Sequence, residues 1–521
     1  MSLPSRDEEF LESLNLASSG STNESLATAA EKELAQLQIQ KQEQMIRQNQ
    51  QFLLQLFQDN ASQPIKVHNV QITNGEQFRD SFIRAQFRPL LAGNIVSFES
   101  YLKTVDNIVK NFVKLGIVEN ILCNTHKVTA PISSGGFLFT RGFSSGRNGS
   151  AGAGAGAGAI SVVPIFNTLP VKRFFAKTGT NIGNGEGDGY IQFQLRNIFG
   201  GGENLVFDAV TGTKTHSSYL VNYNQPLFNN CNYIWENQFS INSRKLDWIQ
   251  SDVMSKTIVN KIYTQFHDTE LNHEIVLENS LRTLSNYGSK SFEVMQQGGQ
   301  SIKSSIGYNL IYDSRDNKHL PFSGKYFQWG VEYNGLFKFN KFPFLKTATQ
   351  IQHSWGIPFL NSHILTSTRF GLLYPLTKKS SSSSFSSFSS VLDRFYIGGP
   401  NDVRSFSLNG LGPRDQNSFI GGDLFLNGGV SLITNVPRYK DSNFKFHNFL
   451  NCGRIVSLDR NSSFIDNFKE LTHSYCLSYG FGILYNHPMA RFELNFVLPL
   501  VANERDSIRK GIQYGIGVSF L

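Results

Sequence analysis

The chain has 521 residues, with 48 basic and 40 acidic side chains and a formal net charge of +8. The basic residues are scattered rather than clustered, which argues against nucleic-acid binding. Aromatic residues reach 13% and glycines number 45, a composition that favours strands and turns over helices. The four cysteines are far apart without CxxC spacing, so neither a zinc site nor a disulfide framework is indicated: Cys123, Cys231, Cys452 and Cys476.

The sequence contains no run of about 18 apolar residues, which excludes an ordinary transmembrane helix. The first ten residues, MSLPSRDEEF, lack the basic start and apolar core of a secretory signal, and their acidic residues argue against a transit peptide. Only a β-barrel would then let this chain cross a membrane, because backbone polar groups must be paired within the protein there.

Residues 1–62 form a polar segment rich in Gln, Ser, Glu and Lys. We expect it to be partly helical or disordered. Its apolar residues gather late, at Phe52, Leu53, Leu56 and Phe57, with a spacing that allows one short amphipathic helix. Such a helix would suit a partner or a membrane surface; a solvated, disordered tail is the alternative.

Residues 63–170 read as a small α+β domain. The segment IKVHNVQIT is predicted to be a strand that ends at the Asn74-Gly75 turn. Further elements are expected in chain order, as helices at 77–87 and 97–115 and strands at 118–125 and 161–166. The segment 132–159 is rich in Gly, Ser and Ala and includes AGAGAGAGA, which predicts a flexible insertion.

From residue 171 to 521 the sequence repeats segments of roughly ten residues with period-two alternation, which is typical of a transmembrane β-barrel. Fifteen or sixteen such segments are present. A soluble β-sandwich also alternates, but repetition over this length favours the membrane barrel. So do aromatic residues suited to membrane interfaces, namely Trp235, Trp329, Tyr333 and Tyr485. Charges at barrel depth, such as Arg491 and Glu493, should face inward.

The segment RFYIGGPNDVRSFSLNGLGPRD, residues 394–415, resembles the characteristic loop of the BamA-type outer-membrane assembly superfamily, also called the bacterial surface antigen family. Its parts are a hydrophobic-Arg-Gly-Phe tetrad, a preceding Gly-Gly pair and a following Gly-Gly-acidic strand start, here Val403-Arg404-Ser405-Phe406, Gly398-Gly399 and Gly421-Gly422-Asp423. Ser405 stands where the family usually has Gly. A backbone φ above zero would therefore be less favourable at this position.

Three further stretches resemble the mitochondrial branch of that superfamily, the core subunits of the sorting and assembly machinery. They are the Asp313-Ser314-Arg315-Asp316 turn, the hairpin at 189–207 and the terminal pattern polar-x-Gly-x-x-hydrophobic-x-hydrophobic at 513–520. The resemblance covers about 65–521. It implies one POTRA domain at 63–170 facing the intermembrane space. It also implies a sixteen-stranded barrel in the mitochondrial outer membrane at 171–521, with a loop at about 376–420 folded into the lumen.

The resemblance gives Arg404 a structural role inside the barrel. It implies that Arg404 pairs with an inward carboxylate, and Glu493 and Asp423 are the candidates. A bidentate Arg–carboxylate contact would hold the loop in place in a low-dielectric interior. Phe406 is expected to be the packing anchor of the tetrad.

The terminal strand is the second candidate site. The first barrel strand, about 171–181, must close against the last, 511–521. Glycines in the last strand have no side chains to pack and should weaken this seam, so a client strand could add to the exposed edge. The alternative is that these glycines only relieve curvature. The residues assigned to the gate and terminal signal are Gly511, Gln513, Gly515, Gly517, Val518 and Phe520.

The resemblance implies a protein that inserts and folds β-barrel precursors, with porin-type clients and metaxin-like accessory subunits. We expect no enzymatic activity, cofactor or metal. His267 and His273 are spaced wrongly for a metal pair, and the run from Gly200 to Gly202 predicts a hairpin turn. Three alternatives are a passive pore, a protein-translocating channel of the same superfamily and a soluble all-β binding module.

Overall fold

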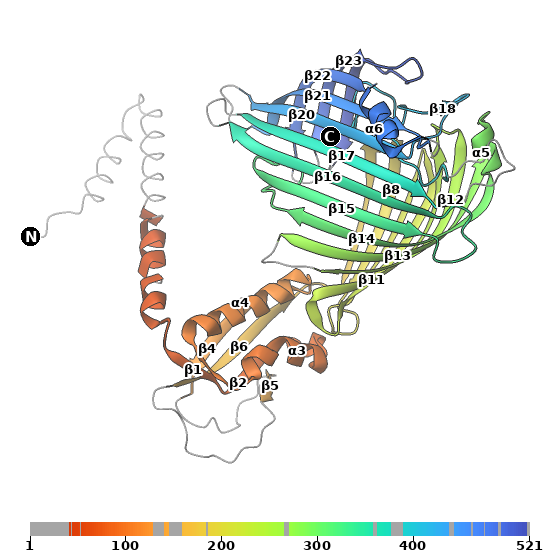
Figure 1. Ribbon diagram of the computed structural model, residues 1–521. Coiled ribbons are helices and arrows are strands. Elements are labelled where there is room, and N and C mark those ends of the chain that lie inside the picture. The colour runs from red at the N-terminus through yellow and green to blue at the C-terminus, as the bar shows by residue number, and fades with distance from the viewer. Residues whose placement is uncertain are drawn as a thin grey trace, which may run out of the picture. The chain divides into compact units, whose positions relative to one another are not determined.

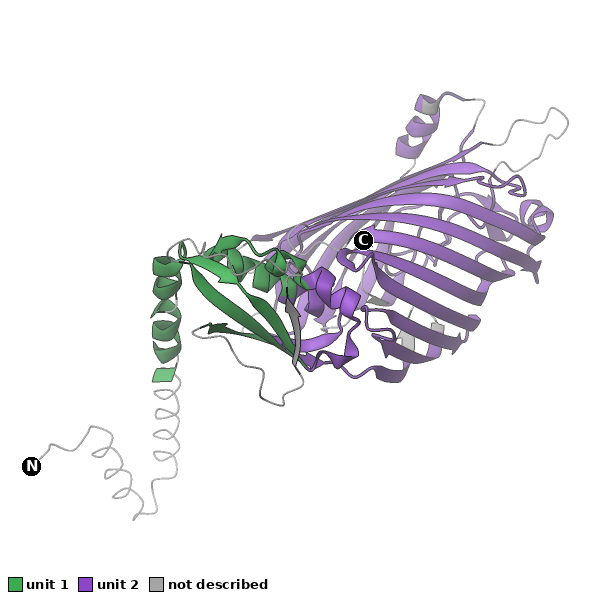
Figure 2. Cartoon of the chain, turned by 90° about the horizontal axis from the view of Figure 1, so that it is seen from below, with its two compact units in different colours: residues 1–73, 87–108, 122–167 green, residues 74–86, 109–121, 168–521 purple. Residues whose placement is uncertain are grey.

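The computed structural model describes residues 41–517 except 43, 53, 129–139, 145–158, 184–185, 265–269, 358–361, 377–388, 437–441, 460–461, 474 and 488–490. The chain forms two compact units (Figure 2). The first holds the described parts of Met1–Thr73, Phe87–Ile108 and Leu122–Asn167. The second holds Asn74–Gln86, Val109–Ile121 and the described parts of Thr168–Leu521. The sequence-based boundaries at residues 62 and 170 stay predictions.

The described end of the N-terminal segment is helical. Residues 44–52 and 54–60 form helix, in agreement with the amphipathic helix expected around Phe57. The Phe57 ring stacks on Phe98 with 5.9 Å between ring centroids. Residues 1–40 of the predicted tail lie outside the described residues.

The small sheet has the strand order β3-β1-β6-β2-β5, and β4 pairs with β6. The expected strand at 65–73 is split at His68, whose N–H donates to Val162 O at 3.0 Å. The other expected helices and strands are present. The elements are β1 (Pro64–Val67), β2 (Asn69–Thr73), η1 (Gly75–Gln77), α3 (Asp80–Leu91), β3 (Ile95–Ser97), α4 (Phe98–Lys114), β4 (Val118–Lys127), β5 (Thr140–Ser144) and β6 (Ile160–Pro170).

The predicted flexible insertion at 132–159 contains a strand, which corrects that part of the prediction. β5 pairs antiparallel with β2, so that Phe143 lies opposite Val70. Apart from residues 140–144 and 159, the insertion lies outside the described residues. The prediction rested on the Gly-, Ser- and Ala-rich composition of the whole segment. It therefore missed a strand of five residues, which includes the strand-forming Thr140 and Phe143.

The second unit is built on a sixteen-stranded sheet in which every strand pairs antiparallel with its neighbours (Figure 1). This confirms the predicted barrel, although its first strand begins at Phe174 rather than Val171. The strands are β7 (Phe174–Gly183), β8 (Glu186–Arg196), β9 (Asn204–Gly212), β10 (Thr215–Leu227), β11 (Asn230–Leu246), β12 (Ser251–Thr264), β13 (Leu271–Asn286), β14 (Gly299–Asp313), β15 (Gly324–Asn334), β16 (Phe344–Ile357), β17 (Ser362–Pro375), β20 (Leu424–Asn435), β21 (Phe444–Val456), β22 (Cys476–Asn486), β23 (Arg491–Val501) and β24 (Gly511–Gly517).

Short elements lie between these strands: α5 (Phe292–Gln296), β18 (Arg414–Asp415), β19 (Ser418–Phe419) and α6 (Phe464–His473). None of the helices among the described residues has both the length and the apolar content needed to cross a membrane.

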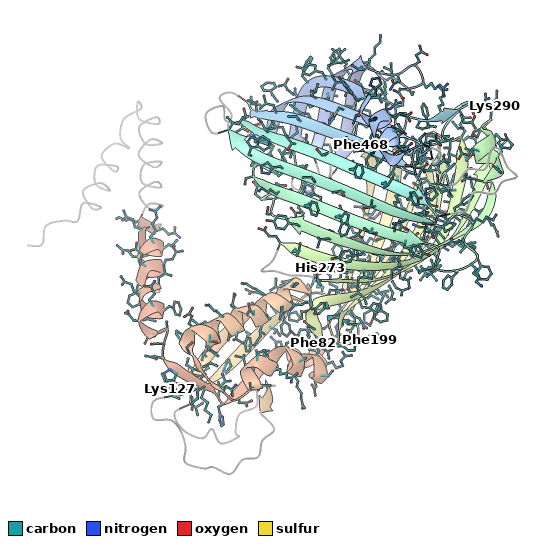
Figure 3. The ribbon with its side chains drawn as sticks, in the orientation of Figure 1. Phe82, Lys127, Phe199, His273, Lys290 and Phe468 are labelled. Atoms are coloured by element: carbon teal, nitrogen blue, oxygen red, sulfur yellow. The ribbon has the colours of Figure 1, made fainter. Side chains whose placement is uncertain are left out.

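Side chains alternate between the two faces of the barrel wall. On β23, Phe492 and Leu494 are exposed on the outer face, whereas Arg491, Glu493 and Asn495 are buried on the inner face, as the alternation predicted. Large apolar side chains cover the outer face of many strands (Figure 3). The wall therefore has an apolar outside and a polar lumen.

Candidate functional site

Residues 389–423, here called the lumen loop, connect β17 to β20 together with residues 376–388. Glycines shape its turns. Gly398 has a φ of +107°, and a Cβ atom there would lie 2.9 Å from Ser407 O. Gly399 has a φ of +127°. A side chain at either position would be strained, so the Gly-Gly pair allows this close folding of the loop on itself.

Arg404 is completely buried inside the barrel. Its Nη2 donates to Glu493 Oε2 at 2.9 Å and its Nη1 donates to Asn451 Oδ1 at 3.0 Å. The guanidinium also lies over the Phe449 ring, 4.5 Å from its centroid. The structure thus brings Arg404 to the first of its two candidate partners, but with one guanidinium nitrogen on the carboxylate instead of the expected two-oxygen fork.

Glu493 is the centre of this cluster. Its Oε1 faces Arg491 in an ion pair, and Asn495 Nδ2 donates to its Oε2 at 2.7 Å. A single buried carboxylate thus lies between two guanidinium groups, so loss of its charge would leave both cations facing each other in the interior. Sequence reasoning placed Arg491 and Glu493 on the inner face but did not predict that they form one cluster with Arg404, and it missed Asn451.

Asp423, the second candidate partner of Arg404, pairs elsewhere. Its carboxylate accepts a hydrogen bond from Ser389 Oγ at 2.7 Å and lies 3.8 Å from Arg394 Nε. This corrects the sequence-based suggestion. The reason is the sharp reversal of the chain, which brings the two ends of the lumen loop together so that Asp423 meets Arg394 rather than Arg404.

A second buried ionic anchor holds the start of the lumen loop. Arg282 of β13 donates to both carboxylate oxygens of Asp393, at 2.6 and 2.9 Å, and Lys346 Nζ donates to Asp393 O at 2.7 Å. Arg394 pairs with Glu293 of α5. Burial is the largest single influence on the Asp393 carboxyl and would raise its pKa, but Arg282, with Lys303 and Lys346, lowers that pKa overall. Sequence reasoning missed this anchor.

Ser405 joins the lumen loop to the last strand. Its N–H donates to Gln513 Oε1 at 3.2 Å, and its carbonyl oxygen accepts from Arg509 N at 2.8 Å. Its backbone φ is +75°, the conformation that the usual Gly would adopt without strain. Its buried Oγ has no hydrogen-bond partner among the described residues.

Phe406 is fully buried in an apolar cluster. It also forms an isolated bridge with Ile508, just before β24. The fully buried Val403 lies in the same cluster, whose other buried members are Ile397, Leu411, Phe425, Ile455 and Cys476. The charged and apolar members of the tetrad therefore make different contacts. Arg404 pairs with Glu493 of β23, and Phe406 packs in the apolar cluster formed by the lumen loop and the barrel wall.

β7 and β24 stand at the two ends of the hydrogen-bonded strand order and are also in contact with each other. On β24, Ile512 and Tyr514 face outward, whereas Gln513 and Gly515 are buried on the inner face. Gly511 begins the strand with a φ of +102°. Gly517 ends its described part, and the predicted signal residues Val518 and Phe520 lie outside the described residues.

The remaining motifs have structural contacts. Arg315 donates to both carboxylate oxygens of Asp313, each at 2.8 Å, and its guanidinium lies over the Tyr326 ring. The glycines at 200–202 form the turn of the β8–β9 hairpin, as predicted, where Gly201 N donates to Glu203 Oε2 at 2.8 Å.

Only one member of the histidine pair is described by the structure. His273 Nδ1 lies 2.8 Å from Tyr308 Oη, and His267 lies outside the described residues. The described part of the chain contains no group of His, Cys, Asp and Glu side chains that could hold a metal ion. The four cysteines are free.

Comparison with known proteins agrees with this architecture. Residues 197–520 match the Omp85 superfamily domain. The chain belongs to the Omp85 superfamily. Over 389 residues it is 32% identical to the sorting assembly machinery 50 kDa subunit of Saccharomyces cerevisiae, covering 70% of this chain and 78% of the relative.

A SAM50-like protein of Schizosaccharomyces pombe is 28% identical over 490 residues, or 90% of this chain and 94% of the relative. With such relatives, the chain is a β-barrel protein of the mitochondrial outer membrane. Its fold also resembles BamA from Haemophilus ducreyi lacking POTRA domains 1–3, with a TM-score of 0.65 and 13% identity over 87% of this chain and 84% of that one.

Proposed function

We propose that this protein inserts and folds β-barrel precursor proteins in the mitochondrial outer membrane. Membership in the Omp85 superfamily and similarity to sorting and assembly machinery subunits support the activity. The observation that carries the mechanism is the contact between the lumen loop and the last strand, through Ser405 and Gln513. A loop that holds the end strand of a barrel is suited to control whether that strand is released.

In the proposed mechanism a client strand pairs with the edge of β7. An edge strand presents unpaired N–H and C=O groups, and these bind an incoming strand through its backbone with little dependence on its side chains. The client displaces β24 from the seam. Gly511 and Gly515 support this step, because glycines have no side chains that would resist separation of the strands.

The lumen loop keeps the wall ordered during this exchange. Arg404 ties the loop to β23 through Glu493, next to the strand that leaves. When β24 separates, the loop loses Gln513 but keeps its anchors on β13 and β23. The barrel therefore opens at one seam while the rest of the wall stays braced.

The proposal extends to orientation and partners. We place the domain at 63–170 in the intermembrane space, where precursors arrive, and metaxin-like accessory subunits at the cytosolic side. Clients are porin-type precursors, and the protein needs no enzymatic activity. A passive pore is less well supported, because the charged and apolar contacts of the lumen loop occupy part of the interior.

The activity is tested by import of a radiolabelled porin precursor into mitochondria depleted of this protein. We expect loss of the assembled, protease-resistant porin while matrix-protein import continues. Normal porin assembly in depleted mitochondria would overturn the proposal and favour a pore.

The gate is tested separately by disulfide mapping. A cysteine in the client's terminal strand should cross-link to Thr178→Cys on β7, and the matched variant Gln328→Cys on β15 should give no such product. Equal cross-linking at both positions would reject pairing at β7 without affecting the depletion result.

A further inference from the structure

Helix α6, Phe464–His473, lies between β21 and β22 at the same end of the barrel as the lumen loop. It contacts β20 and β21 (Figure 1). Leu471 is buried and packs in one cluster with Leu424 and Val456. The helix is held to its connecting segment by Asn467, which donates to Asp459 O and accepts from Asp459 N.

The alternation of the strands shows which side of the wall this helix covers. Leu424 shares its face of β20 with Val430, which is 48% exposed, and Val456 shares its face of β21 with Leu450, which is 42% exposed. These are outward-facing positions. Leu424 and Val456 are nevertheless buried, so α6 lies against the outside of the barrel and not over its lumen.

The position along the strands is equally defined. Leu424 is the first residue of β20 and Val456 is the last residue of β21, and the two are paired in the sheet. The contact is therefore at the rim of the wall. In a membrane barrel this rim lies at the boundary between hydrocarbon and headgroups.

The helix leaves part of its apolar side uncovered. Ile465 is 64% exposed, and Phe468, which is labelled in Figure 3, is 41% exposed. The two residues are three positions apart and therefore lie on one side of the helix. Tyr475, just after the helix, is 50% exposed. The acidic residues Asp466 and Glu470 lie on the other side, and Lys469 flanks Ile465.

We propose that α6 is an interfacial helix that lies in the headgroup boundary of the bilayer and inserts Ile465 and Phe468 among the lipids. The occupant is lipid because this apolar surface continues the lipid-facing wall on which Leu471 packs. Attraction to anionic headgroups is not the driving force, since the helix carries the two acidic residues Asp466 and Glu470 against the single Lys469. Amphipathic helices with aromatic and aliphatic residues on one face bind bilayers in this way.

The test uses the full chain with its four cysteines replaced, reconstituted in phosphatidylcholine–phosphatidylethanolamine vesicles. An environment-sensitive nitrobenzoxadiazole dye is attached through Phe468→Cys or, as the matched control on the polar side, Glu470→Cys. Resistance of the unheated barrel to unfolding in dodecyl sulfate confirms that each variant is folded. Vesicles with or without spin-labelled phosphatidylcholine then report contact with lipid.

We expect a blue-shifted emission at position 468 and several-fold stronger quenching there than at 470. A spin label near the headgroup should quench more than one deep in the acyl chain. Equal, weak quenching at both positions would overturn the proposal. Emission at 468 that shifts only in complexes isolated from mitochondria would overturn it in favour of a protein partner.

Discussion

Ser405 differs from the glycine that is usual in the family, but its backbone adopts a conformation that favours glycine. The resemblance predicted that a serine here would suffer from any positive φ, and the backbone adopts +75°. The main-chain contacts to Gln513 and Arg509 explain why the conformation persists despite its cost. They depend on the backbone, which any residue supplies.

Replacing Ser405 by Gly should stabilise the barrel by about 1 kcal/mol, because it relieves a left-handed serine and removes a buried hydroxyl. The midpoint of barrel unfolding in urea, read from the dodecyl sulfate gel shift, measures the change. Ser405→Ala is the control: it removes the hydroxyl but keeps the strain. Equal midpoints for the Gly and Ala variants would show that the strain is negligible.

Arg404 is the residue whose loss should affect clients most. Arg404→Ala leaves Glu493 with Arg491 and removes the tie between lumen loop and β23. Assembly of a radiolabelled porin should slow by about tenfold, a factor that corresponds to about 1.4 kcal/mol, while the variant still integrates into the membrane. The exposed loop residue Arg414→Ala should assemble porin normally. Unchanged kinetics for Arg404→Ala would rule out its role.

At the residue scale, the sequence predicted the contact of Arg404 with Glu493 because a recognisable motif and an alternating strand both pointed inward. It failed for Arg282 and Asp393, which are separated by 111 residues. Nothing in a local pattern reveals which strand a loop residue meets across the lumen. The same reason explains why Asp423 was predicted to pair with Arg404, whereas it lies beside Arg394.

At the scale of elements, the lumen loop braces two separated parts of the wall. One anchor reaches β13 and α5 through Asp393 and Arg394, and the other reaches β23 and β24 through Arg404 and Ser405. The first anchor is at the start of the loop and the second is near its middle. Each therefore limits movement of the other.

Asp393→Asn should destabilise the barrel by about 3 kcal/mol, because it leaves Arg282 in a buried position without a charged partner. The urea midpoint of the gel shift reports the loss. Asp402→Asn is the control in the same loop. The Asp402 carboxylate lies 3.5 Å from Arg369 and is less buried than that of Asp393, so this substitution should destabilise the barrel less. Equal losses of stability in the two variants would show that the buried Asp393–Arg282 pair stabilises the barrel no more than the Asp402–Arg369 pair.

The same anchor should survive mild acid. Because the folded-state pKa of Asp393 is lowered, its stabilisation is present above the unfolded pKa of about 3.9 and is lost as pH falls through the folded value. Stability measured from pH 7 to 5 should therefore not change through this group. Below about pH 4, the wild-type chain should lose more stability than Asp393→Asn. Parallel curves for the two proteins would contradict the assignment.

At the scale of the whole molecule, the barrel was predictable from the alternation of the strands, whereas a loop inside it was predictable only from the family resemblance. Period-two alternation gives the strand count, and the order of pairing follows because consecutive antiparallel strands pair with their neighbours. The position of the lumen loop depends on contacts between distant residues. The strand β5 was missed because its five residues lie inside a segment of opposite composition.

Removing residues 391–411 should convert the protein into a wider pore. This deletion takes both ionic anchors and much of the apolar cluster out of the interior. Single-channel conductance in planar bilayers should rise several-fold, and a chain with Arg414→Ala should conduct like the wild type. A deletion variant that is folded but has unchanged conductance would show that the loop does not obstruct the lumen.

The contacts of the lumen loop with β23 and β24 also indicate the order in which this barrel folds. The Arg404–Glu493 contact spans 89 residues and the Ser405–Gln513 contact spans 108. Contacts of such long sequence separation form late, after the loop-closure entropy has been overcome. While the chain is still emerging, Arg404 therefore has no β23 to bind. The loop becomes fixed only when the last strands arrive, so its docking marks the completion of the barrel.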